Sequence, residues 1–301
     1  NEKNNSQNRN LDFRNTQKIM DLKNILPTNG PRIEEVSKYI KKYKNDLIVI
    51  KYGGNVFIDR NIFNNFISDI NILNKLGLSI VVVHGGGPRI KRELEKSNIK
   101  TKFVRGLRVT NEKIINIVEN VLINFNNDIV DSLKKKGSKA ESINTKNNNI
   151  IEVVPESKEL GFVGIPNKIK IDTIRSIVKK KVIPIISPLG LGKNNQTYNI
   201  NGDTAAGAIA KSLKSRRLLL MTNVEGVLNK KKELIEEISS SEILEMIKNE
   251  TITEGMIPKI NTCLDAVNNG VAAVGIIDGR KKHSILFEIF SDKGSGTLIR
   301  K

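Results

Sequence analysis

A repeated order of buried strand, glycine turn and helix constrains the fold of this 301-residue chain more than any other feature. The first copy spans residues 47–76 and the second spans residues 79–97, and in both the glycines come where the strand ends. Continuous apolar strands that alternate with helices are typical of a mostly parallel sheet covered on both faces. We therefore expect an α/β fold of three layers, with helices on both sides of one central sheet. Later helices are expected at residues 173–180, 204–214, 239–249 and 256–269, and later strands at residues 182–187, 218–222 and 271–277.

The first expected strand ends in Lys51, which Gly53 and Gly54 follow closely. Adjacent glycines let the backbone approach a ligand and point N–H groups at an anion. In sheets of this kind ligands bind at the carboxyl ends of the strands, so the lysine would face the same crevice. Taken alone, this segment is equally compatible with a plain tight turn.

The second expected strand ends in His84, followed by Gly85, Gly86, Gly87 and Pro88. Three successive glycines are costly in conformational entropy unless the backbone lies against something, so an anion cradle is favoured over a simple turn. The sequence contains neither the P-loop motif nor a G-x-G-x-x-G motif after a strand, so a bound nucleotide would use another architecture. We interpret His84 as a hydrogen-bonded structural residue and not as a base.

Two polar segments could hold a ligand. Arg108 follows a glycine within residues 106–110, where a guanidinium suits bidentate capture of a carboxylate; a surface arginine is the alternative. Asn199, Asn201 and Asp203 alternate just before a helix of small residues. Asp203 could simply cap that helix. The segment also suits a site that binds a polar ligand and orients a lysine.

A second lysine, Lys259, comes shortly after Gly255 at the start of the helix expected at residues 256–269. The helix dipole disfavours a cation there by about 0.3–1 kcal/mol, so the position is better explained if an anion lies beside it. The single Cys263, in the same helix, excludes an internal disulfide and a metal site of several cysteines. We interpret it as a small buried residue.

The formal net charge of +18 raises the question of nucleic-acid binding. The basic residues come in short runs at expected helix ends and turns, and no basic stripe interleaved with aromatic residues occurs. We expect no nucleic-acid partner. The apolar stretches are far shorter than the roughly 20 residues of a membrane span, so we expect no membrane segment. Abundant Lys and Asn without a targeting signal suits a soluble protein of a bacterial cytoplasm, or of the chloroplast stroma if plastid-encoded.

The segment before residue 47 has a character of its own. Residues 1–30 are polar, with a short apolar pattern at Ile19, Leu22, Ile25 and Leu26. This pattern fits one amphipathic helix, or else the segment is a partly disordered tail. A further helix is expected at residues 31–43, with its apolar residues on one face.

Together these segments resemble the amino acid kinase family, and most closely its branch that phosphorylates N-acetylglutamate. The resemblance runs in one order from about Leu47 to the C-terminus. Each segment is weak alone, whereas the ordered set is specific. The segments are KYGG (51–54), HGGGP (84–88), GLRVT (106–110), ELGFVG (159–164), YNINGDTAAG (198–207) and EGMIPKI (254–260).

The resemblance implies transfer of the γ-phosphoryl group of ATP to the side-chain carboxylate of N-acetyl-L-glutamate, the second step of arginine biosynthesis. Lys51 and Lys259 would stabilise the group in transit, and Asp203 would hold both lysines. Arg108 and Asn199 would bind the α-carboxylate and amide of the acceptor. Mg²⁺ would come with ATP, and no tightly bound cofactor or protein metal site is expected. The backbone cradle would be Gly53, Gly54, Gly85, Gly86 and Gly87, and the nucleotide would lie near Thr222 and Asn223.

The same resemblance implies an extension at residues 1–46, an acceptor-binding lobe at 47–190 and an ATP-binding lobe at 191–301. Arginine-inhibited members of the family use an N-terminal helix to interlace dimers into a hexamer. We therefore expect a homo-oligomer, a dimer or hexamer, that L-arginine inhibits, with the PII signalling protein as a further implied partner. The residues that resemble the arginine pocket are Tyr39, His283, Glu288, Gly294 and Gly296; a C-terminal strand and turn is the alternative interpretation.

Some positions depart from the family pattern. Asn223 stands where relatives usually have Asp, residues 55–57 replace small residues, and residues 124–128 and 144–149 are atypical. None of these changes removes a proposed catalytic group. The alternatives are a kinase of aspartate, glutamate, carbamate or UMP, and a non-catalytic basic binding protein on the same scaffold. Arg108 favours N-acetylglutamate, and the retention of both lysines argues against the non-catalytic alternative.

Overall fold

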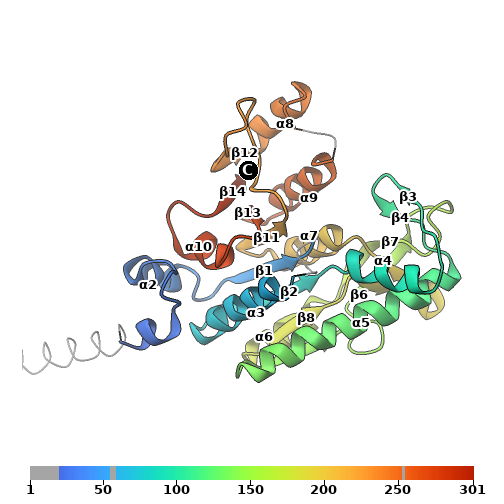
Figure 1. Cartoon of the computed structure of the whole chain (residues 1–301), viewed down its shortest axis with the longest axis horizontal. Helices are drawn as coiled ribbons and strands as arrows, with labels where there is room; N and C mark the ends of the chain where they lie inside the picture. The colour runs from blue at the N-terminus through green and yellow to red at the C-terminus, as the bar shows by residue number, and fades with distance from the viewer. Residues whose placement is uncertain (1–19, 55–58, 253–254) are drawn as a thin grey trace, which may run out of the picture.

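The computed structural model describes residues 20–54, 59–252 and 255–301. Its main sheet is built from β1 (Leu47–Tyr52), β2 (Ser79–His84), β5 (Ala140–Ile143), β8 (Ile183–Ile186), β11 (Arg217–Thr222), β12 (Glu237–Ser239), β13 (Ala273–Asp278) and β14 (Gly296–Arg300). The strand order is β12-β14-β13-β11-β1-β2-β8-β5 (Figure 1). Neighbouring strands pair in parallel except for β13 and β14, which are antiparallel. Strands on both sides of residue 190 therefore share one sheet.

Helices cover both faces of this sheet. One face carries α2 (Ile33–Lys42), α3 (Arg60–Lys75), α5 (Glu112–Lys135) and α10 (Ser284–Phe290). The other face carries α6 (Ile171–Lys179), α7 (Gly202–Leu213) and α9 (Ile257–Asn268). The expected three-layer α/β sandwich is confirmed. Two further helices, α4 (Gly87–Lys96) and α8 (Ser240–Lys248), follow β2 and β12 directly.

The alternation of side chains along β1 decides which residues reach which layer. Ile48 and Ile50 pack into the core beneath α3, whereas Val49 packs into the core beneath α7 and α9. Successive side chains of a strand point to opposite faces, so Lys51 lies on the side of α7 and α9. The same alternation in β2 places His84 on the side of α5, together with Val82.

A smaller, four-stranded sheet precedes α7 in the chain. It consists of β6 (Ile151–Pro155), β7 (Gly164–Ile169), β9 (Leu189–Leu191) and β10 (Thr197–Asn199), in the order β10-β9-β6-β7, with a short 3₁₀ turn at Lys193–Asn195 before β10. Strand β10 leads within three residues into α7. A separate hairpin of β3 (Phe103–Val104) and β4 (Leu107–Arg108) stands beside α4 (Figure 1).

The segment before β1 is ordered from residue 20 onward. Residues 20–25 are helical with Leu22 buried, which favours the amphipathic helix over the disordered tail for that stretch; Ile19 lies outside the described residues. The next helix, α2, buries Val36 and Tyr39 against the core on the α10 side. The apolar pattern of both pieces is therefore satisfied by the chain's own core.

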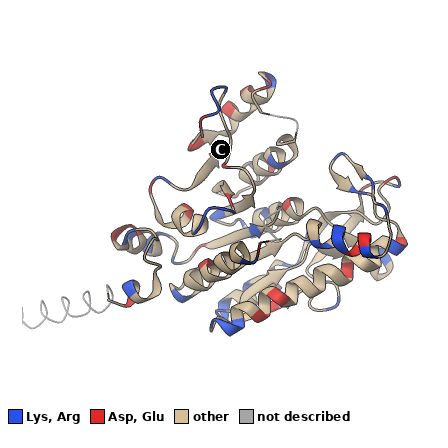
Figure 2. Ribbon diagram, in the orientation of Figure 1, with Lys and Arg blue, Asp and Glu red and all other residues tan. Residues whose placement is uncertain are grey.

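Basic and acidic side chains are interspersed over most helices and loops, as Figure 2 shows. This distribution agrees with the expectation of scattered solvated charges. Among the described residues, no helix combines the length and apolar character that crossing a membrane requires.

Candidate active site

Lys51 stands at the carboxyl end of β1 and its side chain is almost fully buried, with 8% of its surface exposed. Two glycines make room for it. A Cβ atom at Gly53 would overlap the Lys51 ammonium group, and one at Gly202 would lie 3.2 Å from Lys51 Cε. The glycine after the strand is therefore required by the lysine as well as by the turn.

The start of α7 differs from one expectation. Asn201, not Asp203, caps this helix, because its Oδ1 accepts hydrogen bonds from the backbone N–H groups of Asp203 (2.9 Å) and Thr204 (3.1 Å). The interpretation of Asp203 as a cap is thus wrong. Since Asn201 satisfies the first N–H groups of the helix, the Asp203 carboxylate is available for other partners, and its charge in the first turn is favoured by the helix dipole.

Asp203 holds both lysines. Its Oδ1 lies 2.9 Å from Lys51 Nζ, and its Oδ2 accepts a hydrogen bond from Lys259 Nζ. Burial alone would raise the pKa of Asp203, but the two lysine charges outweigh burial and hold this pKa well below its ordinary value. Burial lowers the pKa of Lys51, and the Asp203 charge opposes that shift. The carboxylate thus holds the two ammonium groups close together.

Lys259 is supplied by the first turn of α9, where Pro258 occupies a position compatible with a helix start. The position of Lys259 at the start of a helix predicted an anion beside it. That anion is Asp203, within the same chain. Helices α7 and α9 can approach closely because Gly207 faces Thr262 without a side chain between them. Glu254, part of the sequence segment around Lys259, lies outside the described residues.

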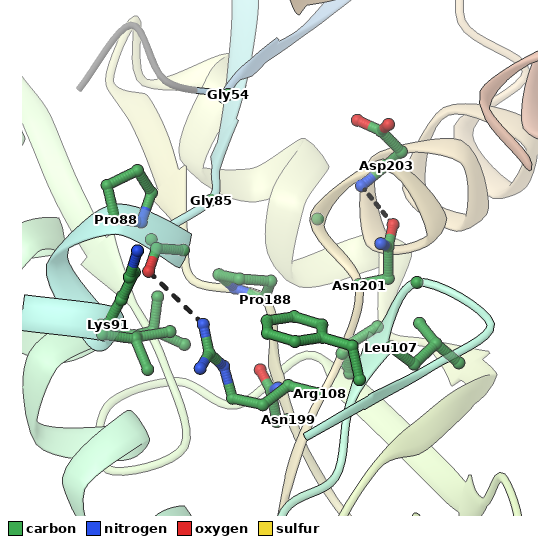
Figure 3. A pocket seen from close by; sticks show the side chains of 18 of the residues that line it. Gly54, Gly85, Pro88, Lys91, Leu107, Arg108, Pro188, Asn199, Asn201 and Asp203 are labelled. Carbon is green, nitrogen blue, oxygen red and sulfur yellow. Dashed lines mark hydrogen bonds between the residues drawn. The ribbon is translucent and has the colours of Figure 1, made fainter. Parts of the chain in front are cut away.

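Lys51 and Asp203 line a cavity of about 770 Å³. Figure 3 shows Asp203 and Asn201 on one side of it, with Gly54, Gly85 and Pro88 across from them. The sequence-predicted site residues that line this cavity are Lys51, Gly54, Gly85, Gly86, Gly87, Arg108, Asn199 and Asp203. Gly53 and Lys259 lie in the layer behind, in contact with Lys51 and Asp203 respectively.

Arg108 and Asn199 also line this cavity, and Figure 3 shows both. The Arg108 guanidinium donates hydrogen bonds to Thr101 Oγ1 (3.0 Å) and the Gly87 carbonyl (3.5 Å), and it stacks 4.7 Å from the Phe103 ring. It is buried, and among the described residues it pairs with no carboxylate. A buried cation without a counter-ion is costly, so this group is suited to an anionic ligand.

The predicted nucleotide residues Thr222 and Asn223 do not line this cavity. Thr222 ends β11, the sheet neighbour of β1, so it lies at the same edge of the sheet as Lys51. The Thr222 hydroxyl lies 3.4 Å from Asn223 Oδ1. Residues 55–57, which depart from the family pattern, lie outside the described residues.

The residues expected to bind arginine lie on the other face of the sheet, around α10. Gly294 and Gly296 line a second cavity of about 540 Å³. Tyr39 donates a hydrogen bond to Asp292 (2.6 Å), and His283 Nδ1 lies 2.7 Å from Asp69. Glu288 does pair with a guanidinium, but it is that of Arg217, at 2.5 Å.

His84 and Cys263 are both buried, as expected for structural residues. Burial lowers the pKa of His84 to about 4, so the ring is neutral at physiological pH. Burial also raises the pKa of the Cys263 thiol. Neither side chain lines the large cavity.

The comparison of the sequence with known families decides the wider assignment. Residues 46–278 match the model of the amino acid kinase family. The chain belongs to the amino acid kinase family. The chain is 55% identical over 281 residues to an acetylglutamate kinase from Pelagibacter ubique, which covers 93% of this chain and 98% of the relative. It is 43% identical over 277 residues to an acetylglutamate kinase from Methylobacterium nodulans, which covers 87% and 91%.

Solved structures share the fold of this chain. An N-acetylglutamate synthase from Neisseria gonorrhoeae, in complex with coenzyme A and N-acetyl-glutamate, superposes with a TM-score of 0.81 at 23% identity over 89% of this chain. This chain spans 62% of the length of that synthase chain. A carbamate kinase from Giardia lamblia superposes with a TM-score of 0.65 at 18% identity, covering 85% and 98% of the two chains.

Sequence reasoning named Asn201 and Gly202 only as members of a motif and gave neither a role in the site. The structure makes Asn201 the helix cap and Gly202 the neighbour of the Lys51 stem. The sequence did contain an indication of the role of Asn201. Asn-x-Asp at a helix start offers two residues that can cap the helix, and only one of them can occupy the cap position. Phe103, which covers Arg108, was also missed; an exposed aromatic in a short hairpin has no pattern of its own.

Proposed function

We propose that the protein is an ATP-dependent kinase that phosphorylates the γ-carboxylate of N-acetyl-L-glutamate, giving N-acetyl-L-glutamyl 5-phosphate in arginine biosynthesis. The similarity to acetylglutamate kinases along nearly the whole chain supports this reaction. The structural observation that carries it is the arrangement of charge around one cavity. Buried Arg108 lines the cavity, and so do Lys51 and Asp203, with Lys259 paired to Asp203. Such a cavity suits an acceptor with two anionic ends.

In this proposal Arg108 binds the α-carboxylate of the acceptor and Asn199 hydrogen-bonds its amide. The side-chain carboxylate then extends toward Lys51 and the backbone N–H groups of the glycine turns. Holding both ends of the acceptor converts the reaction into one between prealigned groups, which is a large part of the catalysis available in phosphoryl transfer.

The chemical step needs no general base, because the acceptor carboxylate is already ionised at neutral pH. A carboxylate oxygen attacks the γ-phosphorus of ATP, the new O–P bond forms, and the bond to the ADP oxygen breaks. Lys51 and Lys259 neutralise the charge on the transferring group, and Asp203 keeps both ammonium groups in place. His84 and Cys263 take no part in proton transfer.

The residues at the site fit Mg²⁺ carried on the phosphates of ATP. Both oxygens of Asp203 already face lysines, and among the described residues no group of three or more His, Cys, Asp or Glu side chains could hold a metal ion. When bound, Mg²⁺ would supply charge neutralisation on the phosphates. We propose that the nucleotide lies over residues 191–301 near Thr222 and Asn223, with the acceptor mainly over residues 47–190.

An acceptor panel tests the proposed reaction. The purified protein with MgATP and N-acetyl-L-glutamate should form an acyl phosphate that hydroxylamine traps as a hydroxamate. Aspartate, glutamate, carbamate and UMP are the competing acceptors, with ADP release measured for all five. A signal with aspartate or glutamate and none with N-acetyl-L-glutamate would overturn the substrate assignment.

We also propose that L-arginine inhibits the enzyme from the cavity beside Gly294 and Gly296. Because Arg217 holds Glu288, an arriving arginine would have to share or displace this contact. The test measures the kinase rate at rising L-arginine concentration. The same measurement is made on Glu288→Gln, which keeps the shape of the side chain but removes its charge. A parent protein insensitive to L-arginine would refute the proposal.

The wider organisation is also a proposal. A homo-oligomer, dimer or hexamer, is testable by light scattering of the purified chain, and PII binding by co-sedimentation. The sources of the two relatives favour a bacterial cytoplasm over a plastid as the compartment.

A further inference from the structure

A closed polar network lies directly behind the glycine turn that follows β2. It joins His84, at the end of β2, to Asn126 on the buried face of α5 and Ser187 just after β8. His84 Nδ1 lies 2.8 Å from the Gly85 carbonyl oxygen. His84 Nε2 lies 3.2 Å from Ser187 Oγ and 3.1 Å from Asn126 Nδ2. The function proposed above leaves this network without a role.

The partners fix the direction of each hydrogen bond. A carbonyl oxygen only accepts, so Nδ1 of the His84 ring carries the proton and donates to Gly85. Because the buried ring is neutral, Nε2 is the acceptor. Asn126 Nδ2 donates to the Ile185 carbonyl (2.8 Å) and to Ser187 Oγ (3.0 Å), and the Ser187 hydroxyl can then donate to Nε2. Asn126 and Ser187 thereby hold the ring in one tautomer and one orientation.

The peptide between Gly85 and Gly86 is the point where this network meets the cavity. In a trans peptide the C=O and N–H groups point in opposite directions. When the Gly85 carbonyl is held by the buried ring, the Gly86 N–H points away from the ring, toward the side on which Gly85, Gly86 and Gly87 line the cavity. This N–H donates to no acceptor among the residues that the structure describes.

The rest of the turn is already fixed. The Gly85 N–H donates to the Tyr52 carbonyl at the end of β1 (2.8 Å), and a Cβ atom at Gly86 would meet Leu122 Cδ2 at 2.4 Å. The orientation of the Gly85–Gly86 peptide plane is then set by the hydrogen bond from His84 to the Gly85 carbonyl.

We propose that His84 is a positioning residue for phosphoryl transfer: through the Gly85 carbonyl it orients the Gly86 N–H toward the anion in the cavity, with Asn126 and Ser187 holding the ring. This inference rests on the proposed kinase function for its catalytic consequence. Its structural part, the orientation of one peptide, stands apart from the identity of the acceptor.

Two substitutions of His84 separate the two ring nitrogens. In His84→Asn, the amide Nδ2 takes the place of Nδ1 and can still donate to Gly85. In His84→Gln, the longer amide reaches the position of Nε2 and leaves the Gly85 carbonyl without its donor. We expect His84→Asn to keep kcat within a few-fold of the parent, whereas His84→Gln should lower kcat by up to about 10²-fold, the loss typical of a misplaced reacting group.

A matched control removes an equally buried hydrogen bond away from the cavity. Ser138 donates to Asn71 (2.8 Å), and both are buried between α3 and the end of α5. Ser138→Ala should lower the thermal midpoint about as much as His84→Gln and leave kcat and KM unchanged. A fall of kcat that follows the thermal midpoint across all three variants would assign His84 a structural role only and overturn the inference.

A readout without catalysis keeps the two proposals distinct. The amide resonance of Gly86, measured by NMR, should agree between parent and His84→Asn and shift in His84→Gln, whichever acceptor the enzyme uses. Identical Gly86 resonances in all three proteins would overturn the inference even if N-acetylglutamate is the acceptor. Conversely, a parent that phosphorylates only another acceptor would refute the substrate assignment and leave the Gly86 shift as the deciding result.

Discussion

Two acidic side chains that form ion pairs, the partly buried Asp203 and the buried Glu288, lie on opposite faces of the same sheet. Asp203 sits on the α7 face beside the carboxyl end of β1, and it pairs with Lys51 and Lys259. Glu288 sits on the α10 face beside Arg217, the first residue of β11. Both carboxylates are paired with cations, yet of the two only Asp203 lines the large cavity.

The difference lies in what remains for a ligand. Each lysine ammonium group carries three donors, so Lys51 and Lys259 keep donors to spare after pairing with Asp203. The Arg217 guanidinium donates to Glu288 and to Tyr43 (3.0 Å), and the second Glu288 oxygen accepts from the Ser295 N–H (2.8 Å). The Arg217 Nε–H has no partner among the described residues, but Arg217 lines neither the cavity at Lys51 nor the cavity at Gly294. One cluster is arranged to act on an arriving anion, whereas the other ties α10 and the end of α2 to the sheet. An ion pair therefore indicates a site for an anion only when one of its unused donors lies at a cavity, as Lys51 does.

The largest expected effect comes from Asp203→Asn, which keeps the shape of the side chain but removes the charge that holds both lysines. Loss of one transition-state donor costs about 10²–10³-fold in kcat, and here two donors are affected, so we expect a fall of about 10³-fold or more. Steady-state kinetics with MgATP and N-acetyl-L-glutamate measure it. A variant with kcat within tenfold of the parent would show that the lysines need no anchor and would break the comparison.

Arg217→Met should give the next largest effect, on stability and not on turnover. It leaves Glu288 buried without its counter-ion, which typically costs about 3–5 kcal/mol in the free energy of unfolding. Denaturant unfolding measures this loss, and kcat of the folded enzyme should stay unchanged because Arg217 lies at the far end of β11.

The double variant Arg217→Met with Glu288→Leu serves as the matched control. Replacing a buried pair with apolar groups is often close to neutral, so most of the lost stability should return. If the double variant were as unstable as Arg217→Met, then packing around Tyr43, and not the orphaned carboxylate, would explain the effect.

The sequence predicted the Lys51–Asp203–Lys259 cluster better than the Arg217–Glu288 pair, and the reason is physical. Lys51 follows a strand and precedes glycines, and parallel strands gather such positions at one edge. Arg217 begins a strand after a polar turn, where an exposed cation is the ordinary case. Its pairing with Glu288 joins positions far apart in the sequence and depends on how α10 packs, which no local pattern encodes.

The same distinction applies to the helices. The elements with a clear apolar period were found to within a few residues, as for α7 and α9. Helix α5, 24 residues long, was not among the expected elements, although Asn111 caps it. Its buried face includes Asn126, which interrupts the apolar period because it serves His84 and not the core. A buried polar residue that belongs to a hydrogen-bond network interrupts the apolar period of its helix, so periodicity alone cannot predict that it is buried.

The pH dependence of stability should separate Asp203 from the neutral His84 nearby. His84 has a pKa of about 4 in the folded protein against an ordinary 6.5, so the unfolded chain takes up more protons between these values. The neutral His84 ring therefore contributes to the free energy of unfolding in full above pH 6.5. This contribution, about 3 kcal/mol, is lost as pH falls toward 4. The stabilisation from Asp203, whose folded pKa is lowered, persists through this window and is lost only below its ordinary value of 3.8.

Unfolding free energies at pH 7, 5.5 and 4.5 test this separation. Relative to the parent, His84→Asn should flatten the loss between pH 7 and 4.5, while Asp203→Asn should leave that slope in place. A slope that vanishes in Asp203→Asn would show that the carboxylate titrates in this range and that the lysines do not hold its pKa down.

The smallest expected effect concerns Lys211 and Asp265, which join the same two helices, α7 and α9, as Asp203 and Lys259 do. Their ion pair, at 2.7 Å, is exposed, with 37% and 50% of the two side chains accessible. Exposed pairs contribute about 0.2–1 kcal/mol, so a double-mutant cycle of Lys211→Ala and Asp265→Ala should find a coupling in that range and no change in kcat. If kcat fell as much as in Asp203→Asn, then the contact between α7 and α9 would determine the turnover rate. The charge of Asp203 at the cavity would not be the cause.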